Sequence, residues 1–564
     1  MFPLLEIKDL NISFLEEGMS TLALNDISLT VTKGKITAIV GESGSGKSVT
    51  ALSILQLLPK QAAIKGKILF SRYGSKQEDL IRLNSKDIST IRGNHIAMVF
   101  QEPMTSLNPV LTCGFQVMET LARHQKLSRE KAKEKTIRLF EQVELPQPAS
   151  MLTRYPHEIS GGQKQRVMIA MAMCCEPDLL IADEPTTALD VRIQKNILQL
   201  IKELQLKKNM GVLFITHDLG LVADIADELI VMYKGRIVEK GNAAEILKNP
   251  QHNYTKALLA CRPASGSKGK KLAVLTDYIQ KGNNVTDEKI EMTATKPEQA
   301  IPFLTIEGLN VYYPVKKNLF GKPISFIKAV DQVSFEVNKG EITGLVGESG
   351  CGKTTLGRAI LQLIKPTAGK IWLNGNELTA MPAKKLREYR KEFQIVFQDP
   401  YGSLNPRITI GNAILEALQV HGLYENTTIR KEAVIDMLEK VQLSPDHFKR
   451  YPHQFSGGQR QRVCIARALI LDPSFLVFDE SVSALDVSVQ AGILNLINEL
   501  KNSMNFTAIF ISHDLSVVHY ISDKILVMNQ GKIIESGNAD DIYHNPVMEY
   551  TKQLIDAIPG KGVI

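Results

Sequence analysis

The sequence predicts an α/β protein built from two tandem domains, each organised around a phosphate-binding loop. Three observations support this prediction. A glycine-rich octet occurs twice, each copy lies between a predicted strand and a predicted helix, and the motifs around it recur in the same order. The octets are GESGSGKS, Gly41–Ser48, and GESGCGKT, Gly347–Thr354. Both fit G-x-x-x-x-G-K-[ST], a loop whose backbone N–H groups close around phosphate oxygens.

The surroundings of each octet predict a strand, a loop and a helix in succession. The apolar run ITAIV precedes the first octet and ITGLV precedes the second, while VTALSILQLL and TLGRAILQLI follow as helix-forming stretches. This order places bound phosphate at a helix N-terminus, where the helix dipole favours anions. Glycine-rich surface turns are the alternative, but they would not require this context in both places.

The second half of the chain restates the first. YPHEISGGQKQRV returns as YPHQFSGGQRQRV, and LLIADEPTTALDV returns as FLVFDESVSALDV, each 296 residues later. This spacing indicates a duplicated domain rather than a short-period repeat. We predict a first domain over 1–263, a linker over 264–302 and a second domain over 303–564. The linker is polar and interrupted by Gly, Pro, Ser and Lys, and we expect its basic run SKGKK to be solvated.

Composition limits the class of protein. The 564 residues suffice for more than one domain, and the 44% hydrophobic and 23% charged fractions are ordinary for a soluble chain. No apolar run approaches the about 18 residues of a membrane helix, and the start lacks the features of a signal peptide. The net charge of +7 permits contact with an anionic membrane face but does not indicate nucleic-acid binding. The six cysteines form no C-x-x-C pair, so we expect buried free thiols rather than a zinc or iron–sulfur site.

Each octet supplies the residues expected to hold the phosphates of a nucleotide. The lysine reaches the β- and γ-phosphates, the hydroxyl residue ligates magnesium, and the glycines leave the backbone open to phosphate. The predicted binding residues are Gly41, Glu42, Ser43, Gly44, Ser45, Gly46, Lys47, Ser48 and Val49 in the first half, and Gly347, Glu348, Ser349, Gly350, Cys351, Gly352, Lys353, Thr354 and Thr355 in the second.

An acidic pair ends a predicted strand in each half. LLIAD and FLVFD are apolar runs that finish in Asp183 and Asp479, and these fit the residue that holds magnesium. The following Glu184 and Glu480 are placed to orient and polarise the attacking water, and each acts as a general base if it reaches that water. A surface turn is the alternative for an Asp-Glu pair, but the phosphate-binding loop upstream favours the catalytic interpretation.

A glutamine and a histidine complete each predicted site. Gln101 and Gln398 follow the strand-like runs IAMVF and FQIVF, where a neutral amide can touch both the metal and a moving segment. We therefore predict both a catalytic and a metal-binding role for them. His217 and His513 end VLFIT and AIFIS. A lone histidine after a strand is usually structural, but its recurrence in matching motifs favours a sensor of the γ-phosphate.

The motifs ISGGQ and FSGGQ precede two further helical stretches. Each offers a serine hydroxyl and an open glycine backbone at a helix start, which are the features of an anion-binding N-terminus. The predicted residues are Ser160, Gly161, Gly162, Gln163, Ser456, Gly457, Gly458 and Gln459. Two phosphate sites in each half exceed what one nucleotide needs.

Taken in this order, the loop, the glutamine, SGGQ, the Asp-Glu strand end, the A-L-D loop and the histidine resemble the nucleotide-binding domain of an ABC ATPase, twice over nearly the whole chain. The resemblance implies a RecA-like α/β core with an antiparallel β subdomain and an α-helical signature subdomain. It also implies head-to-tail pairing, with each ATP and its Mg²⁺ between one phosphate-binding loop and the opposite signature. One site then joins Gly41–Ser48 to Ser456–Gln459, and the other joins Gly347–Thr354 to Ser160–Gln163.

The same resemblance implies roles for further residues. Asp190 and Asp486 are expected at the seam between the halves. Phe14 and Tyr313 align with the aromatic residue that stacks on adenine, a contact worth about 1–3 kcal/mol in other base-stacking systems. The second half departs from the family at Ser481, where proline usually follows the glutamate. Neither glutamate is lost, so both sites are expected to hydrolyse ATP.

Three uses are open to a double ATPase of this kind that lacks a membrane span. It can power a transporter through separate membrane subunits, act on ribosomes as an ABC-F factor, or act in DNA maintenance. The last group needs long coiled coils or zinc modules, and ABC-F proteins usually have a long helical linker. FQEPMTSLNP, FQDPYGSLNP, the YPH before each signature and the Y-T-K tails instead resemble the peptide/opine/nickel uptake group.

In that group two different ATPase subunits are normally separate chains. The two halves of this chain resemble such a pair fused into one. The implied partners are two transmembrane permease subunits and an extracytoplasmic solute-binding protein, without nucleic acid. The implied location is peripheral, on the cytoplasmic face of the inner membrane. A peptide or peptide-like solute is expected, while dipeptide, oligopeptide, glutathione, peptide antibiotic and nickel all stay open.

Overall fold

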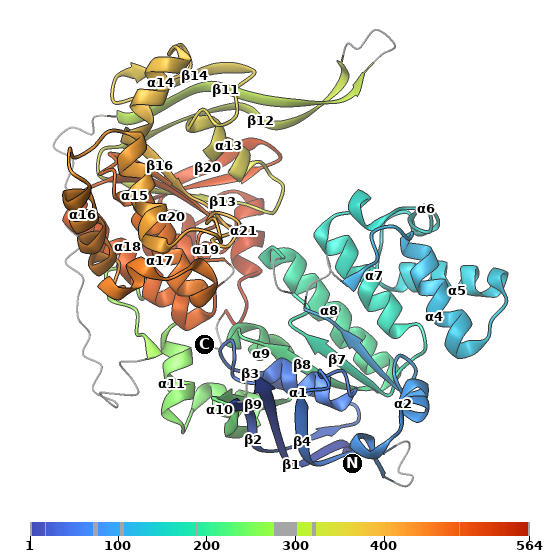
Figure 1. Cartoon of the computed structure of the whole chain (residues 1–564). Helices are drawn as coiled ribbons and strands as arrows, with labels where there is room; N and C mark the ends of the chain where they lie inside the picture. Colours follow the sequence, from blue (N-terminus) through green and yellow to red (C-terminus); the bar gives the residue numbers. More distant parts are fainter. Residues whose placement is uncertain are drawn as a thin grey trace.

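The computed structural model of the chain describes residues 3–16, 19–71, 77–101, 106–186, 189–264, 266–275, 302–317, 323–483 and 485–561. It shows two halves of the same architecture, blue to green and yellow to red in Figure 1. Each half combines a four-stranded sheet, a six-stranded sheet and a group of helices. The predicted duplicated α/β fold is therefore confirmed. The later part of the predicted linker, 276–301, lies outside the described residues.

The six-stranded sheet of the first half forms the centre of its nucleotide-binding core. Its strands are parallel except for the edge pair β9–β10. Every residue of β3, β7 and β8 is buried, as expected for parallel strands that are covered on both faces. In sheet order the strands are β10 (Arg236–Asn242), β9 (Glu228–Tyr233), β3 (Ile36–Val40), β8 (Gly211–Thr216), β7 (Leu179–Asp183) and β6 (Ile96–Val99).

The four-stranded sheet of the first half is antiparallel and packs its apolar face onto the core. Its order is β2 (Met19–Thr32), β1 (Pro3–Glu16), β4 (Ala62–Phe70) and β5 (Glu78–Asp79). The helices are α1 (Lys47–Ile54), α2 (Ser85–Ile91), α4 (Cys113–Gln125), α5 (Arg129–Gln142), α6 (Pro148–Met151), α7 (Gly161–Met173), α8 (Val191–Lys208), α9 (Leu219–Ile225), α10 (Ala243–Lys248) and α11 (Asn253–Ala260).

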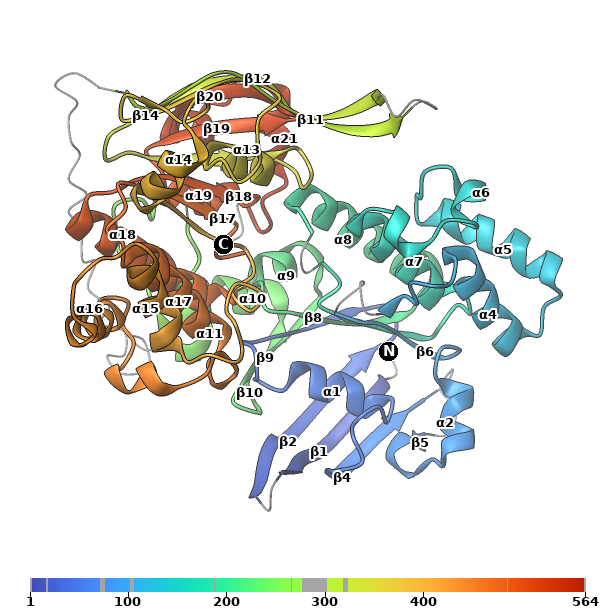
Figure 2. The same ribbon diagram turned by 45° about the horizontal axis from the view of Figure 1, so that its top comes forward.

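Helices α4 to α7 form a separate group at one end of the first half, on the right in Figures 1 and 2. Val117, Leu121 and Phe140 of this group are fully buried, and they belong to one apolar cluster that continues into the six-stranded sheet. This group corresponds to the α-helical signature subdomain that the family resemblance implies, and the four-stranded sheet corresponds to the antiparallel β subdomain.

The second half repeats both sheets in the same spatial order. The antiparallel sheet is β12 (Pro323–Asn338), β11 (Pro302–Lys317), β14 (Ala368–Leu373) and β15 (Asn376–Glu377). The six-stranded sheet is β16 (Phe393–Val396), β17 (Phe475–Asp479), β18 (Thr507–Ser512), β13 (Ile342–Val346), β19 (Lys524–Asn529) and β20 (Lys532–Asn538). The helices are α13 (Lys353–Ile360), α14 (Ala383–Tyr389), α15 (Ile410–Val420), α16 (Thr427–Lys440), α17 (Gly457–Leu469), α18 (Val487–Met504), α19 (Leu515–Ile521), α20 (Ala539–His544) and α21 (Glu549–Asp556).

The six cysteines are buried thiols, as predicted. Among the described residues, no helix combines the length and apolar character that a bilayer crossing requires. The basic run SKGKK was expected to be solvated, and this holds for Lys271, whose side chain is 40% exposed, but is wrong for Lys268, whose side chain is only 19% exposed. Lys268 pairs with Asp540 at 3.3 Å and Lys271 pairs with Glu499 at 3.0 Å, because this segment lies against the second half.

Candidate nucleotide sites at the two phosphate-binding loops

The first phosphate-binding loop joins β3 to α1, as the sequence predicts. Gly46 caps α1 with φ at 100°, in the left-handed region that glycine adopts without strain. Lys47 is 5% exposed, and its Nζ donates to the carbonyl oxygens of Gly41 at 2.7 Å and Glu42 at 2.9 Å. Burial lowers the pKa of Lys47. An anion bound in the loop would offset this cost, since it would stabilise the charged form of the lysine.

The second loop has the same geometry between β13 and α13. Gly352 caps α13 with φ at 111°. Lys353 is 4% exposed and donates to Gly347 O at 2.7 Å and Glu348 O at 2.9 Å. Added side-chain atoms at Gly347 would collide with a backbone oxygen 2.2 Å away, so the loop requires glycine there. The repeated octet thus folds into two equivalent cradles of backbone N–H groups.

A hydroxyl and a carboxylate lie together beside each loop. Ser48 Oγ donates to Asp183 Oδ1 at 3.2 Å, and Thr354 Oγ1 donates to Asp479 Oδ1 at 2.8 Å. The hydroxyl oxygens at the start of α1 and α13 and the carboxylate oxygens at the end of β7 and β17 are the hard ligands that Mg²⁺ prefers, so the residues fit a magnesium ion. Burial raises the pKa of Asp183 to about 6. A cation at this position would restore the charged carboxylate.

The candidate metal sites of the two halves differ by one charged neighbour. Arg358, one turn beyond Thr354 on α13, places Nε 3.9 Å from Asp479 Oδ2. The matching position in the first half, six residues after Gly46, is Leu52. Asp479 is 1% exposed, whereas the Arg358 side chain is 44% exposed. Sequence reasoning did not single out this arginine.

In the first half the predicted catalytic residues converge on Glu184. This glutamate follows β7 directly, and its backbone N–H donates to Ile215 O at 2.9 Å. Gln101 Nε2 donates to Glu184 Oε2 at 3.0 Å, and His217 Nδ1 lies 3.3 Å from the same oxygen. Burial opposes protonation of His217, but the hydrogen bond and charge of Glu184 outweigh it and raise the histidine pKa. Three strand ends thus bring an amide, a carboxylate and an imidazole to one point.

The second half assembles the same three groups. Gln398 Nε2 donates to Glu480 Oε2 at 2.8 Å, and His513 Nδ1 lies 3.8 Å from that oxygen. Burial alone would raise the pKa of Glu480, but the neighbouring His513 and the charge of Lys353 outweigh it and hold the pKa below its usual value. Ser481 is 2% exposed and leaves this arrangement unchanged. The carboxylate therefore stays ionised at neutral pH, as a residue that accepts a proton from water requires.

Each signature motif begins a helix and caps it. Ser160 Oγ accepts from Gln163 N at 3.3 Å, while Ser160 N donates to Gln163 Oε1 at 3.1 Å. Ser456 and Gln459 repeat this capping box at the start of α17 with the same distances. In neither view does α7 lie beside α13 or α17 beside α1 (Figures 1 and 2).

The halves meet through the aspartates expected at the seam. Ser43 N in the first loop donates to Asp486 Oδ2 at 3.1 Å, and Ser349 N in the second loop donates to Asp190 Oδ2 at 3.4 Å. Each phosphate-binding loop therefore touches the opposite half directly, and the pairing is reciprocal as head-to-tail packing requires.

The residue two positions after each seam aspartate makes a second contact across the seam, and sequence reasoning missed this contact. Arg192 Nη1 lies 2.9 Å from Glu348 Oε1, and Ser488 Oγ donates to Glu42 Oε1. The two glutamates occupy the second position of each octet. Their partners differ between halves, so the repeat alone does not identify the contact.

The two predicted adenine-stacking residues lie on the long strands of the antiparallel sheets. Tyr313 on β11 is 40% exposed and so can present a ring face. Phe14 on β1 is half-buried against the core of the first half, where it pairs with Ala62 of β4. The exposure of Tyr313 fits a stacking surface better than the packing of Phe14 does.

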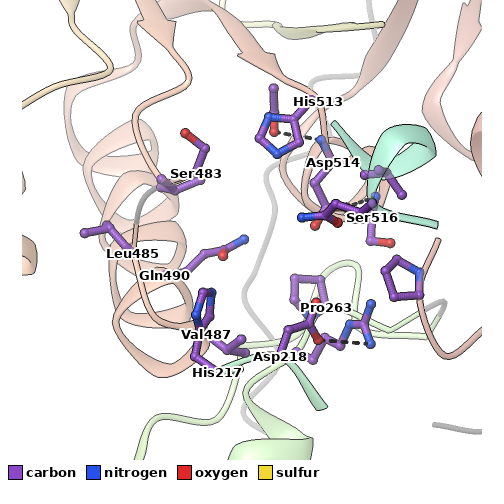
Figure 3. Close-up of a pocket in the computed structure, with 16 residues that line it drawn as sticks. His217, Asp218, Pro263, Ser483, Leu485, Val487, Gln490, His513, Asp514 and Ser516 are labelled. Carbon is purple, nitrogen blue, oxygen red and sulfur yellow. Dashed lines mark hydrogen bonds and ion pairs between the residues drawn. The ribbon is translucent and has the colours of Figure 1, made fainter. Parts of the chain in front are cut away.

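A cavity of about 90 Å³ lies between the halves and is lined by both predicted sensor histidines. Figure 3 shows His217 and His513 on opposite sides of it, with Asp218 and Asp514 nearby. One residue of each candidate site therefore lines a single cavity between the halves.

Comparison with known protein families agrees with the duplicated site. The model of the ABC transporter family matches residues 24–187 and 330–483. A second model, the oligopeptide/dipeptide transporter C-terminal region, matches residues 238–283 and 534–562. Both models therefore match once in each half.

Curated relatives match over nearly the whole chain. The glutathione import ATP-binding protein GsiA of Escherichia coli (strain K12) is 45% identical over 563 residues, covering 98% of this chain and 89% of that protein. The proteins of the same name from Salmonella choleraesuis and Pectobacterium atrosepticum are 46% and 44% identical, with the same coverage. Among solved structures, the dimeric ATP-binding cassette MJ0796 in a post-hydrolysis state is 25% identical with a TM-score of 0.38, over 42% of this chain and 98% of that one.

Proposed function

The chain belongs to the ABC transporter family, with an ATPase domain in each half, and we propose that ATP-driven closure of these halves powers the import of a peptide-like solute through separate membrane permeases. One observation supports the ATPase mechanism most directly. In each half a glutamine and a histidine both approach the carboxylate that follows the metal-binding aspartate, next to the phosphate-binding loop.

The chemistry assigned to each residue follows from its position. The loop backbone and Lys47 or Lys353 hold the phosphates of ATP, and Glu184 or Glu480 accepts the proton of the attacking water. His217 and His513 hold those glutamates in place and sense the γ-phosphate. Mg²⁺, when bound by the Ser–Asp or Thr–Asp pair with the nearby glutamine, supplies charge neutralisation for phosphoryl transfer.

Closure couples the two sites. We infer that ATP on one loop draws the opposite signature toward it, so that Ser456–Gln459 completes the site of Lys47, and Ser160–Gln163 completes that of Lys353. ATP then favours the closed state because only that state contacts it from both halves. The seam contacts already present at Ser43 support this direction of pairing.

The proposed partners are two transmembrane permeases and an extracytoplasmic solute-binding protein, with the chain peripheral on the cytoplasmic face of the inner membrane. The match to the oligopeptide/dipeptide transporter C-terminal region in both halves supports import. It favours import over the ABC-F alternative, in which the same paired ATPase would act on ribosomes. The names of the whole-length relatives make glutathione a first solute to test within the peptide-like class.

The ATPase proposal is tested by replacing both glutamates. In Glu184→Gln/Glu480→Gln, ATP binding is expected to persist because the amide preserves size, while turnover falls by at least a hundredfold because no carboxylate accepts the water proton. Equilibrium binding of a fluorescent ATP analogue and phosphate release measure the two effects. Turnover at the wild-type rate would overturn the assignment of these residues.

The importer proposal is tested by isolating the tagged chain from its own cells in mild detergent. Two multi-span membrane proteins are expected to accompany it, and ATP hydrolysis in reconstituted vesicles is expected to rise with loaded binding protein. Co-purification with ribosomes, with no membrane protein present, would replace the importer proposal by the ABC-F alternative.

A further inference from the structure

Residues 266–275, which follow the first half, lie mainly against the second half, while Leu275 at their end packs against the core of the first half. Leu272 is 3% exposed and belongs to the main apolar core of the second half, as does Cys261 just after α11. Val274 packs against the same core. In Figures 1 and 2, α11 lies on the side of the first half that faces the second. We name residues 266–275 the strap.

The strap is held through its backbone, in the way a docked peptide is held. Leu272 N donates to Asn495 Oδ1 at 3.0 Å, and Asn495 Nδ2 donates back to Leu272 O at 2.8 Å. Asn495 is 4% exposed, so these bonds form away from water. Tyr520 Oη donates to Lys270 O at 2.9 Å. The side chains of α18 and α19 thus satisfy strap backbone groups that would otherwise be buried without a partner.

Charge adds a second kind of contact to the strap. Lys271 pairs with Glu499 at 3.0 Å, and Lys268 pairs with Asp540 at 3.3 Å. Both lysines belong to the strap, and both carboxylates belong to the second half. Exposed pairs of this kind contribute little to affinity, but they fix the register of the strap because a shifted segment would lose both.

The matching surface of the first half is chemically different. The position that corresponds to Asn495 is Gln199, which donates to Glu203 on its own helix. The position that corresponds to Tyr520 is Asp224, which accepts from Gly560 N at 3.3 Å. The first half therefore meets the end of the second half through other atoms, and the set of side chains that holds the strap is particular to the second half.

From these contacts we propose that the strap is a docking element that keeps the two halves paired when no nucleotide is bound. Because it packs into the core of the second half, it holds one side of the molecule closed. The loop and signature surfaces on the other side can then separate and meet again without the halves dissociating. Pairing of this kind makes closure around ATP an intramolecular event at high effective concentration. The proposal requires neither ATP hydrolysis nor transport.

The test removes the covalent connection and keeps the strap. A protease site is inserted within 276–301 of the full chain, the folded protein is cut, and the fragments are analysed by gel filtration and sedimentation without nucleotide. The fragments are expected to stay together. Asn495→Ala/Tyr520→Phe is expected to weaken their association at least tenfold, whereas Gln199→Ala, the matched change in the first half, is expected to leave it unchanged.

A pair of charge-exchange variants distinguishes loss of strap docking from a folding defect. Lys271→Glu is expected to weaken association several-fold, and adding Glu499→Lys is expected to restore it. Circular dichroism and ATP-analogue binding of each cut variant establish that both halves remain folded. Separation of the wild-type fragments without nucleotide, or wild-type association in Asn495→Ala/Tyr520→Phe, would overturn the proposal.

Discussion

Arg358 makes the metal site of the second half different from that of the first. Its guanidinium lies 3.9 Å from the carboxylate that is proposed to hold Mg²⁺, and a fixed positive charge there opposes a divalent cation. Exposure of the arginine screens this effect, so we expect a several-fold rather than a larger difference. The two sites should therefore bind Mg²⁺ with unequal affinity.

Replacing Arg358 with the residue of the first half tests this difference. In the Glu184→Gln/Glu480→Gln background, Mg²⁺-dependent binding of an ATP analogue is expected to show two classes of site. Arg358→Leu should strengthen the weaker class several-fold, and Arg358→Lys should leave it weak because the charge remains. Two unchanged classes in Arg358→Leu would assign the difference to other residues.

Individual site residues were predictable where one motif supplies the chemistry. Lys47, Asp183 and Glu184 each come from a short pattern whose spacing fixes the geometry. The Arg192–Glu348 pair could not be predicted, because its partners lie far apart in the chain and the second half has Ser488 where the first has Arg192. A contact whose residues differ between the two halves cannot be recognised from a repeated sequence pattern.

At the scale of elements, both signature helices need glycine where they cross the following helix. A Cβ at Gly458 would lie 2.3 Å from Val489 Cγ1 on α18, and one at Gly162 would lie 2.9 Å from Ile193 Cγ2 on α8. Overpacking of this kind costs about 1–3 kcal/mol. Gly458→Ala is therefore expected to lower the unfolding midpoint more than Gly162→Ala does, by several degrees in a thermal melt. Equal midpoints would show that α17 shifts freely away from α18.

The pair α19–α20 predicts a pH dependence of stability. His519 on α19 is 2% exposed, bonds to Asp540 at 2.8 Å and stacks on Tyr543. Burial lowers its pKa, and the charges of Lys268 and His544 lower it further against the opposing effect of Asp540. The unfolded state, with a pKa of about 6.5, therefore binds more protons than the folded state. Stability should fall as pH drops below that value.

Thermal melts without nucleotide at pH 7.5 and 5.5 measure this effect. The wild-type midpoint is expected to fall more between these two pH values than that of His519→Gln, whose side chain does not titrate. Identical shifts in the two proteins would show that other groups control acid sensitivity.

Elements were predictable from the sequence to the extent that their signal is local. The buried runs before each loop predict β3 and β13 because covered parallel strands are continuously apolar. The docking of the strap was not predictable. A polar, lysine-rich segment is typical of a solvated linker, and the residues that hold it, Asn495 and Tyr520, lie more than two hundred positions away.

At the scale of the whole molecule, coupling between the two nucleotide sites depends on which hydrogen bonds the seam aspartates make within their own half and across the seam. Asp190 caps α8 by accepting from Ile193 N at 2.9 Å and also reaches Ser349 across the seam. Asp486 makes the matching bond to Ser43 at 3.1 Å, but its side chain does not cap α18. Asp190 therefore both caps a helix and contacts the other half, whereas Asp486 contacts the other half without capping a helix.

Alanine at each position should distinguish those roles. Asp486→Ala removes the bond across the seam without removing a helix cap, so ATP turnover is expected to fall several-fold while the thermal midpoint stays within a degree or two of the wild type. Asp190→Ala also removes a helix cap worth about 1 kcal/mol, so turnover and midpoint should both fall. Asp190→Asn should recover the midpoint, because asparagine caps a helix as well as aspartate does. Wild-type turnover in Asp486→Ala would show that the halves communicate through other contacts, such as the one between Glu42 and Ser488.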